Sequence, residues 1–435
     1  MKTKQFYLLI WLSWPLLALS QPLLTEADAV RIGLENNYNI RLVKKEVAIA
    51  ENNNSLGSAG FLPEIALTAG QNYSINDSKQ EFLTGQVNDR KGARSDAFSA
   101  AAQLNWTLFD GLQMFRRYDI LNTMQQQSEL ELLLAVENNV YNILANYYSL
   151  VQINLQLDVV KTTIEVDHER VALAGQMLEI GAGSRLELLQ AEVDRNADSA
   201  LFLDLNDRIA QLKTVVNDLL GRDPGVEFKV ADSFAIQENL IREILLQKML
   251  ENNTSLMLSA QDEKLAQLSL KEIRGRQAPE LDFNLGYTFN DQNSEAGFLK
   301  TSQTNGITYG LSARMNLFNG FSVRRDKQNA HIMLESSQLR IASLENSLKA
   351  ELYQQFEAYT NSMHLLRMES QNVLAARENL EIASERYQLG DLSGIEFREA
   401  QRNFMAAESR LLSARLQVKI SEISLRQLAG ELALE

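Results

Sequence analysis

The sequence predicts an α+β fold in which a duplicated chain supplies four amphipathic β-strands and two very long helical hairpins. Three observations carry this prediction. Motifs recur at a constant spacing, four short segments alternate between apolar and polar residues, and the ranges 112–180 and 321–389 are almost free of glycine and proline. Together they favour one subunit of an elongated assembly over a compact domain.

The two halves of the chain are related by a tandem duplication. Leu-Phe-Asp-Gly at 108–111 returns as Leu-Phe-Asn-Gly at 317–320, an offset of 209 residues (317 − 108). Three more positions recur at the same offset, as Gly181 and Gly390, Glu187 and Glu396, and Gly221 and Gly430. Four separated matches at one offset are not expected by chance. We expect repeats at 22–221 and 237–430, joined by a linker at 222–236.

Two segments in each repeat alternate with a period of two, which is the period of a β-strand. The expected strands lie at about 64–75, 97–109, 280–290 and 306–318. Each is close to the roughly 9–11 residues that a tilted strand needs to cross a bilayer. The apolar positions include the aromatic residues expected to face lipid, which are Phe98, Trp106, Tyr287, Phe289 and Tyr309.

A soluble sheet half-buried against helices would show the same alternation. Strand length and aromatic content favour a transmembrane β-barrel instead. Four strands cannot close such a barrel, because the smallest bacterial examples have about eight and an open edge cannot face lipid. Several chains must therefore share one barrel.

The first 20 residues have the features of a secretory signal peptide. Lys2 and Lys4 precede an apolar stretch at 6–19, and Ala18 and Ser20 supply small residues at the expected cleavage site. That stretch is shorter than the roughly 20 residues of a membrane-spanning helix. No later segment has 18 consecutive apolar residues, so a helical membrane protein is not predicted.

The hairpins are expected at 112–221 and 320–430. At about 1.5 Å per residue, the first helix of each would extend roughly 100 Å, and apolar residues spaced by three and four indicate coiled-coil packing. Glycines permit the chain to reverse at 181–184 and 390–394, where a serine can cap the returning helix. The turn residues are Gly181, Gly183, Ser184, Gly390 and Gly394.

Acidic residues follow the second turn. Glu396 and Glu399 are three residues apart and so share a helical face, and Glu187 is the repeat partner of Glu396. In an isolated coiled coil these carboxylates would be solvated surface. In a tube made of several chains they would recur around the axis as an acidic ring that acts as a gate.

No enzyme, metal site or cofactor is predicted. The chain has no cysteine, and its three histidines are scattered on expected helices without the i, i+4 partner of a zinc helix. The formal net charge of −14 disfavours nucleic acid as a partner.

Taken in this order, the motifs resemble the TolC-type outer-membrane efflux proteins over essentially the whole chain after the signal peptide. The residues that carry the resemblance are Pro63 and Pro279 before the first strand of each repeat, Gly111 and Gly320 at the exits into helix, and Tyr387 leading to Glu396 and Glu399. The resemblance implies a homotrimer with a 12-stranded barrel above an α-helical periplasmic tunnel.

The resemblance also implies a location and partners. The barrel would lie among the lipids of the outer membrane of a Gram-negative bacterium. The turns, including Arg185 and Tyr387, would dock a periplasmic adaptor (membrane fusion) protein that leads to an inner-membrane RND or ABC transporter. The chain departs from the archetype at Leu392, which stands where an arginine ties the closed end of the tunnel. Arg185 is a candidate substitute, so the means of closure stays open.

Three functions remain open. Two share one conduit, namely the exit duct of a drug or metabolite efflux pump and the exit duct of type I protein secretion driven by an ABC transporter. The third is a soluble periplasmic coiled-coil adaptor, which would have one hairpin flanked by compact β domains. Two hairpins and four amphipathic strands favour the duct.

Overall fold

The computed structural model describes residues 23–432. The expected signal peptide at 1–20 lies outside this part of the chain. The elements in order are β1 (Leu23–Leu24), α1 (Glu26–Asn36), α2 (Tyr38–Asn53), α3 (Leu56–Ala59), β2 (Glu64–Glu81), β3 (Val87–Phe109), α4 (Gln113–Glu179), α5 (Arg185–Leu219), β4 (Lys229–Val230), α6 (Arg242–Asn252), α7 (Thr254–Gly275), β5 (Glu280–Ser294), β6 (Thr301–Arg314), α8 (Ser322–Gln388) and α9 (Gly394–Leu428).

The described chain divides into two compact units. The hairpin unit comprises 23–38, Asn138–Leu240 and Gln354–Gln427, and the sheet unit comprises Asn39–Glu137, Ile241–Tyr353 and 428–432. Each unit takes segments from both sequence repeats. The duplicated segments therefore fold together within each unit rather than as separate domains.

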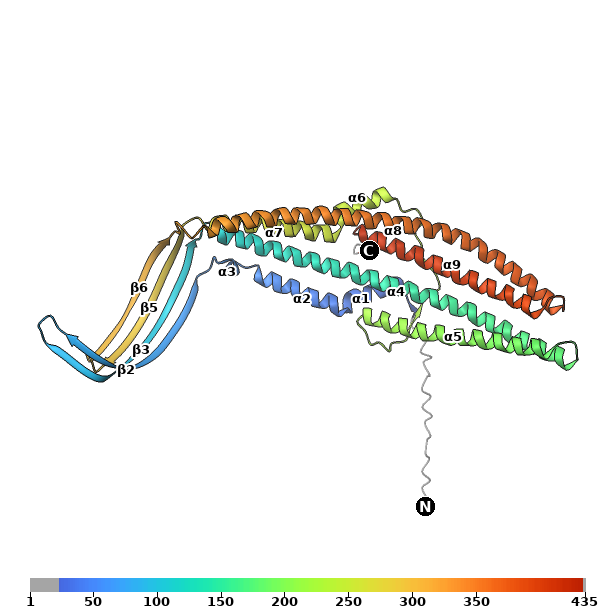
Figure 1. Cartoon of the computed structure of the whole chain (residues 1–435), viewed down its shortest axis with the longest axis horizontal. Helices are drawn as coiled ribbons and strands as arrows, with labels where there is room; N and C mark the ends of the chain where they lie inside the picture. The colour runs from blue at the N-terminus through green and yellow to red at the C-terminus, as the bar shows by residue number, and fades with distance from the viewer. Residues whose placement is uncertain (1–22, 433–435) are drawn as a thin grey trace, which may run out of the picture. The chain divides into compact units, whose positions relative to one another are not determined.

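The sheet unit contains one antiparallel sheet in the order β2-β3-β5-β6 (Figure 1). Its register aligns the apolar positions across all four strands. For example, Leu67 pairs with Ala102, Ala102 with Tyr287, and Tyr287 with Ile307. Residues paired across a sheet lie on the same face, so one face is apolar and the other is mainly polar.

The strands of the first repeat are longer than expected. β2 runs to Glu81 instead of about 75, and β3 begins at Val87 instead of about 97. The added residues pair with one another after an irregularity between Asn76 and Ser78, where the amide of Gly92 donates to Asp77. These residues are charged and polar on both faces, so they give no alternating pattern in the sequence.

The last strand ends earlier than expected. β6 stops at Arg314, whereas the prediction continued to 318. Arg314 pairs with Glu280, the first residue of β5, so no residue of β5 lies opposite the positions that follow. In the first repeat Phe109 still pairs with Leu281, and β3 continues to the glycine turn.

The long helices each contain 67 residues, which corresponds to roughly 100 Å of helix. Within the hairpin unit, the α4 positions spaced by three and four are buried, as Val140, Ile143, Tyr147 and Leu150 show. The Tyr147 hydroxyl donates to the carbonyl of Leu24 at 3.1 Å, which fixes the parallel pair β1–β4 against α4. None of the helices within residues 23–432 has the length and apolar character needed to cross a lipid bilayer.

The last carbonyl of each hairpin accepts a hydrogen bond from an asparagine side chain. In the hairpin unit, the side-chain amide of Asn37 donates to the carbonyl of Leu219 at the end of α5, at 2.9 Å. In the sheet unit, the side-chain amide of Asn253 donates to the carbonyl of Leu428 at the end of α9, at 3.0 Å. Each bond satisfies a carbonyl that the helix leaves without a partner.

Candidate functional site

The first hairpin turn, between α4 and α5, is built by a glycine and a capping box. Gly181 has a φ of +75°, a conformation that residues with a side chain rarely adopt. The Ser184 hydroxyl accepts from the amide of Glu187, and the Glu187 carboxylate accepts from the amide of Ser184, both at 3.2 Å. Reciprocal bonds of this kind satisfy two amides at the start of α5.

The second turn, between α8 and α9, repeats this arrangement. Gly390 has a φ of +78°. The Glu396 carboxylate accepts from the hydroxyl of Ser393 at 2.7 Å and from its amide at 3.1 Å, and these bonds hold the pKa of Glu396 below its ordinary value. The Arg386 guanidinium donates to the side chain and the backbone carbonyl of Asp391, at 3.1 Å each. The exposed Glu396 therefore stays ionised near neutral pH.

Leu392, in the turn between α8 and α9, packs against apolar side chains instead of supplying a charge. It contacts an apolar cluster made of Ala383, Phe397 and Ala400. Tyr387 stacks on Phe397 in the same cluster, with ring centroids 5.0 Å apart. The hydrophobic side chain at 392 thus stabilises the turn through burial, a role that an arginine would not fill.

The three predicted gate residues are exposed in the structure. Glu187 and Glu396 also cap their helices, which the S-x-x-E pattern at both turns could have indicated. Glu399 is exposed one turn further along α9. Arg185 is exposed in the first turn of α5. An acidic ring requires several copies of these residues, so the ring stays a prediction.

Sequence reasoning missed a buried charge network close to the turns. Arg398 of α9 binds Asp198 of α5 through two nitrogens, at 2.6 and 3.0 Å. Its Nε also lies 3.6 Å from Asp194 of the same helix. Arg170 of α4 lies 2.9 Å from Asp194. Arg398 therefore joins the second hairpin to the first.

Asp167 of α4 completes the network. It is 1% exposed, accepts from the side-chain amide of Gln401 at 3.0 Å, and lies 3.9 Å from Arg398. Burial raises the pKa of Asp167 to about 6, and the neighbouring carboxylate of Asp198 adds to the increase. One signal could have identified the cluster, because Arg398 stands where the first repeat has the apolar Leu189.

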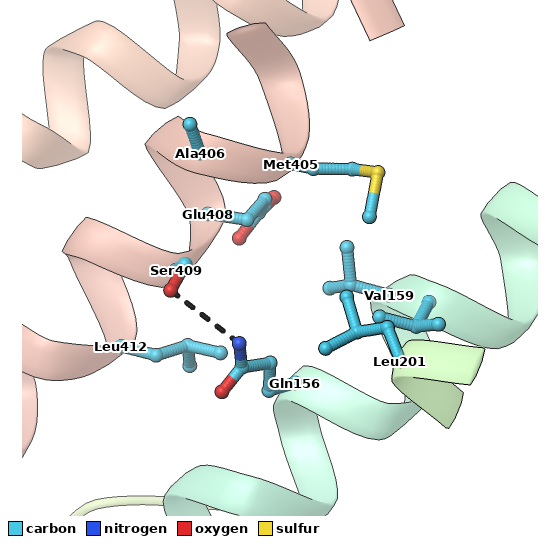
Figure 2. A pocket seen from close by; sticks show the side chains of 9 residues that line it. Gln156, Val159, Leu201, Met405, Ala406, Glu408, Ser409 and Leu412 are labelled. Carbon is cyan, nitrogen blue, oxygen red and sulfur yellow. Dashed lines mark hydrogen bonds between the residues drawn. The ribbon is translucent and has the colours of Figure 1, made fainter. Parts of the chain in front are cut away.

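A small cavity lies where α4, α5 and α9 meet. Figure 2 shows Val159, Leu201 and Met405 pointing toward one another from these three helices. The Gln156 side chain donates to Ser409 at 3.5 Å beside the cavity (Figure 2). Close packing between the two hairpins is interrupted at this cavity.

The predicted lipid-facing aromatics lie on the apolar face of the sheet. Four of them are exposed, namely Phe98, Trp106, Tyr287 and Tyr309. Phe98 also packs edge to face on Phe289, with ring centroids 6.2 Å apart. The Trp106 indole donates to the carbonyl of Phe61 at 2.9 Å. Lipid contact stays a prediction for all five side chains.

The predicted helix–strand junctions stand at the boundaries of the observed elements. Pro63 and Pro279 immediately precede β2 and β5. Gly111 and Gly320 have φ values of +72° and +64°, and each is followed by another residue with positive φ. The chain therefore turns from strand to helix in the same conformation in both repeats.

Comparison with protein families identifies the chain. A model described as outer membrane efflux protein matches residues 30–222 and 245–431, which together include most of the sequence. The chain belongs to the outer membrane efflux protein family. As a member of that family, the protein is an exit duct of the outer membrane with a helical part in the periplasm.

Relatives of this efflux protein include secretion and efflux components. It is 20% identical to the proteases secretion protein PrtF of Dickeya chrysanthemi, over 93% of the chain and 88% of the relative. It is 21% identical to the outer membrane protein TolC of Vibrio cholerae, over 86% of the chain and 83% of the relative.

Solved outer-membrane channels share the fold. The Campylobacter jejuni CmeC channel has a TM-score of 0.76 at 16% identity and is matched over 93% of this chain and 85% of its own. The open Neisseria gonorrhoeae MtrE channel has a TM-score of 0.72 at 16% identity and is matched over 94% of this chain and 89% of its own. These solved relatives are channels rather than enzymes.

Proposed function

We propose that the protein is the outer-membrane channel of a tripartite efflux pump, which three copies of the chain form together. The observation that carries this proposal is the four-stranded sheet with one apolar face. Its edge strands β2 and β6 would pair between copies, because unpaired edges are not stable in lipid. Three copies would give 12 strands, and the apolar face would contact the outer-membrane lipid.

The hairpin turns are the proposed gate and docking surface. Glu187, Glu396 and Glu399 are exposed at these turns, and three copies would gather their carboxylates around one axis. An adaptor protein would bind at the turns and connect the channel to an inner-membrane RND or ABC transporter. The channel itself would conduct cargo passively, and the inner-membrane transporter would supply the energy.

The exit duct of a type I secretion system is the second candidate. The similarity to PrtF, a protease secretion protein, extends over 93% of the chain and favours it. Purification from native membranes separates the two candidates. An RND transporter in the recovered complex would indicate efflux of small molecules, whereas an ABC transporter that co-purifies with a protein substrate would indicate type I secretion.

The barrel proposal is tested by placing one charge on either face of β5. Leu285→Arg introduces a charge on the apolar face, which costs roughly 2–4 kcal/mol near the middle of a bilayer. Asn284→Arg places the same charge on the polar face and is the matched control. We expect far less Leu285→Arg than Asn284→Arg in the outer-membrane fraction, measured by immunoblotting after detergent extraction.

Two results would contradict the proposal. Equal amounts of both variants in the outer membrane would show that the apolar face does not contact lipid. Recovery of the unaltered protein in the soluble periplasmic fraction would support the adaptor alternative.

A further inference from the structure

The charge network at Arg398 gathers five charged side chains between the two hairpins, and three of them are buried. Asp167 and Arg170 come from α4, Asp194 and Asp198 from α5, and Arg398 from α9. Asp167, Arg170 and Asp198 are each no more than 5% exposed. Burying charges carries a large desolvation cost, which hydrogen-bonded partners must offset.

Most ion pairs on these helices do not bridge the hairpins. Arg410 of α9, for example, binds Glu369 of α8 at 3.1 Å within the second hairpin, with half of its side chain exposed. Exposed pairs of this kind contribute little to stability. Removing Arg398 would instead leave two buried carboxylates and the partly exposed Asp194 facing one remaining cation. Breaking a buried pair is strongly destabilising.

We propose that Arg398 and its three aspartate partners form a proton-sensitive joint that holds the α8–α9 hairpin against the α4–α5 hairpin and limits opening of the conduit. In this way Arg398 supplies the connection that Leu392 cannot. The gating part of this proposal rests on the proposed channel function. The joint itself rests on the contacts alone.

Proton sensitivity follows from the charges that face Asp167. Three aspartates meet two arginines, so the fully ionised network carries one excess negative charge. Asp198 faces Asp167 from α5, Arg398 and Gln401 face it from α9, and Oδ2 of Asp167 has no hydrogen-bond partner among the described residues. A proton on Asp167 would remove the excess charge and give Oδ2 a hydrogen to donate.

The direction and size of the pH effect follow from linkage. The pKa of Asp167 is raised from 3.8 to about 6 in the closed joint, so closure binds a proton and is favoured as pH falls through 6. Between pH 7.5 and 5.0 the closing equilibrium should strengthen roughly tenfold. Glu396 does not contribute in this range, because its pKa is lowered.

Thiol labelling measures the joint directly, since the chain has no cysteine of its own. Ala191 of α5 is 1% exposed, and its neighbour Gln190 is exposed. The maleimide labelling rate of Ala191→Cys is divided by that of Gln190→Cys in the full chain. This ratio cancels the pH dependence of thiol reactivity and reports how often the joint opens. We expect it to fall about tenfold between pH 7.5 and 5.0.

Two pairs of variants test the residues involved. Arg398→Leu should raise the labelling ratio at least tenfold, whereas Arg410→Leu should leave it unchanged. Asp167→Asn should keep the ratio low at both pH values, because the amide imitates the protonated acid. Asp158→Asn, an exposed aspartate of the same helix that pairs with Lys161, should keep the normal pH response.

Conductance of the channel in planar bilayers is the second readout. It should rise in Arg398→Leu and should fall with acidification in the unaltered protein but not in Asp167→Asn. Equal labelling ratios in Arg398→Leu and Arg410→Leu would overturn the joint. A raised ratio with unchanged conductance would overturn its role in opening. Labelling as expected in a protein that never conducts would contradict the proposed channel and leave the joint supported.

Discussion

The returning helices of the two hairpins, α5 and α9, have the same contacts at their C-terminal ends and different contacts near their N-terminal ends. At the ends of α5 and α9, an asparagine of the preceding helix pair donates to the last carbonyls, and a glycine follows. Near the starts of the same helices, Leu189 of α5 is 48% exposed, whereas the side chain of its repeat partner Arg398 is 13% exposed and lies among carboxylates. The two repeats therefore share the contacts at the ends of α5 and α9 and differ in the residues that lie between the hairpins.

The partners of Arg398 show the same divergence. Asp167, Asp194 and Asp198 correspond in the second repeat to Ala376, Asn403 and Ala407. Ala407 is 1% exposed within an apolar cluster. Three carboxylates therefore occupy positions that are uncharged in the other copy, which a purely structural requirement on the duplicated fold would not produce. The contrast indicates that the network serves the contact between hairpins.

The largest effect is expected at the glycines that follow each hairpin. A Cβ at Gly221 would lie 2.4 Å from the carbonyl oxygen of Asn36, and one at Gly430 would lie 2.5 Å from that of Asn252. Both glycines have positive φ. Gly221→Ala and Gly430→Ala should each lower the free energy of unfolding by about 3 kcal/mol, measured by denaturant unfolding of the detergent-solubilised protein.

Gly390→Ala is the control for backbone strain alone. Gly390 also has positive φ, but a Cβ there would meet open space. We expect this variant to cost about 1 kcal/mol. Equal costs at all three glycines would show that the close approach of the asparagine carbonyls does not matter.

A smaller effect is expected at the asparagines. Asn37→Ala and Asn253→Ala each leave a helix-terminal carbonyl without its side-chain donor, and such a loss costs about 1–3 kcal/mol. Because the two bonds are equivalent in the repeats, the two unfolding free energies should fall by similar amounts. A fall in the free energy of unfolding in only one variant would show that the two asparagine bonds are not equivalent.

The smallest effect on structure, with a change in function, is expected at the acidic residues of the turns. Glu396→Gln with Glu399→Gln should lower the cation selectivity of the channel several-fold, measured from reversal potentials in planar bilayers. Glutamine can still accept the Ser393 bonds, so the turn should be retained. Glu187→Gln removes one charge per chain and should have a weaker effect. Unchanged selectivity in the double variant would place the selective region elsewhere.

The periodic elements of this fold could be predicted from the sequence, whereas the strand extensions and the buried charge network could not. The strict alternation at 280–290 predicted a strand, and the range 321–389 without glycine or proline predicted a long helix. The structure has β5 and α8 at these positions. The extension of β2 beyond 75 has no such period, because its pairing depends on main-chain bonds with β3. Arg398 was missed because its ion-pair partners lie on helices about 200 positions away in the sequence, and no local pattern indicates such a contact.

The pairing of β1 with β4 has a consequence for export. Leu23 pairs with Lys229, and Leu24 with Val230, so the first described residues find their partners only after an entire repeat has followed. In a chain that crosses the inner membrane with its N-terminus leading, this pair therefore cannot form until Lys229 and Val230 have emerged. Contacts so distant in sequence are slow to form. Because the hairpin unit also includes Gln354–Gln427, it is completed only after nearly the whole chain has crossed.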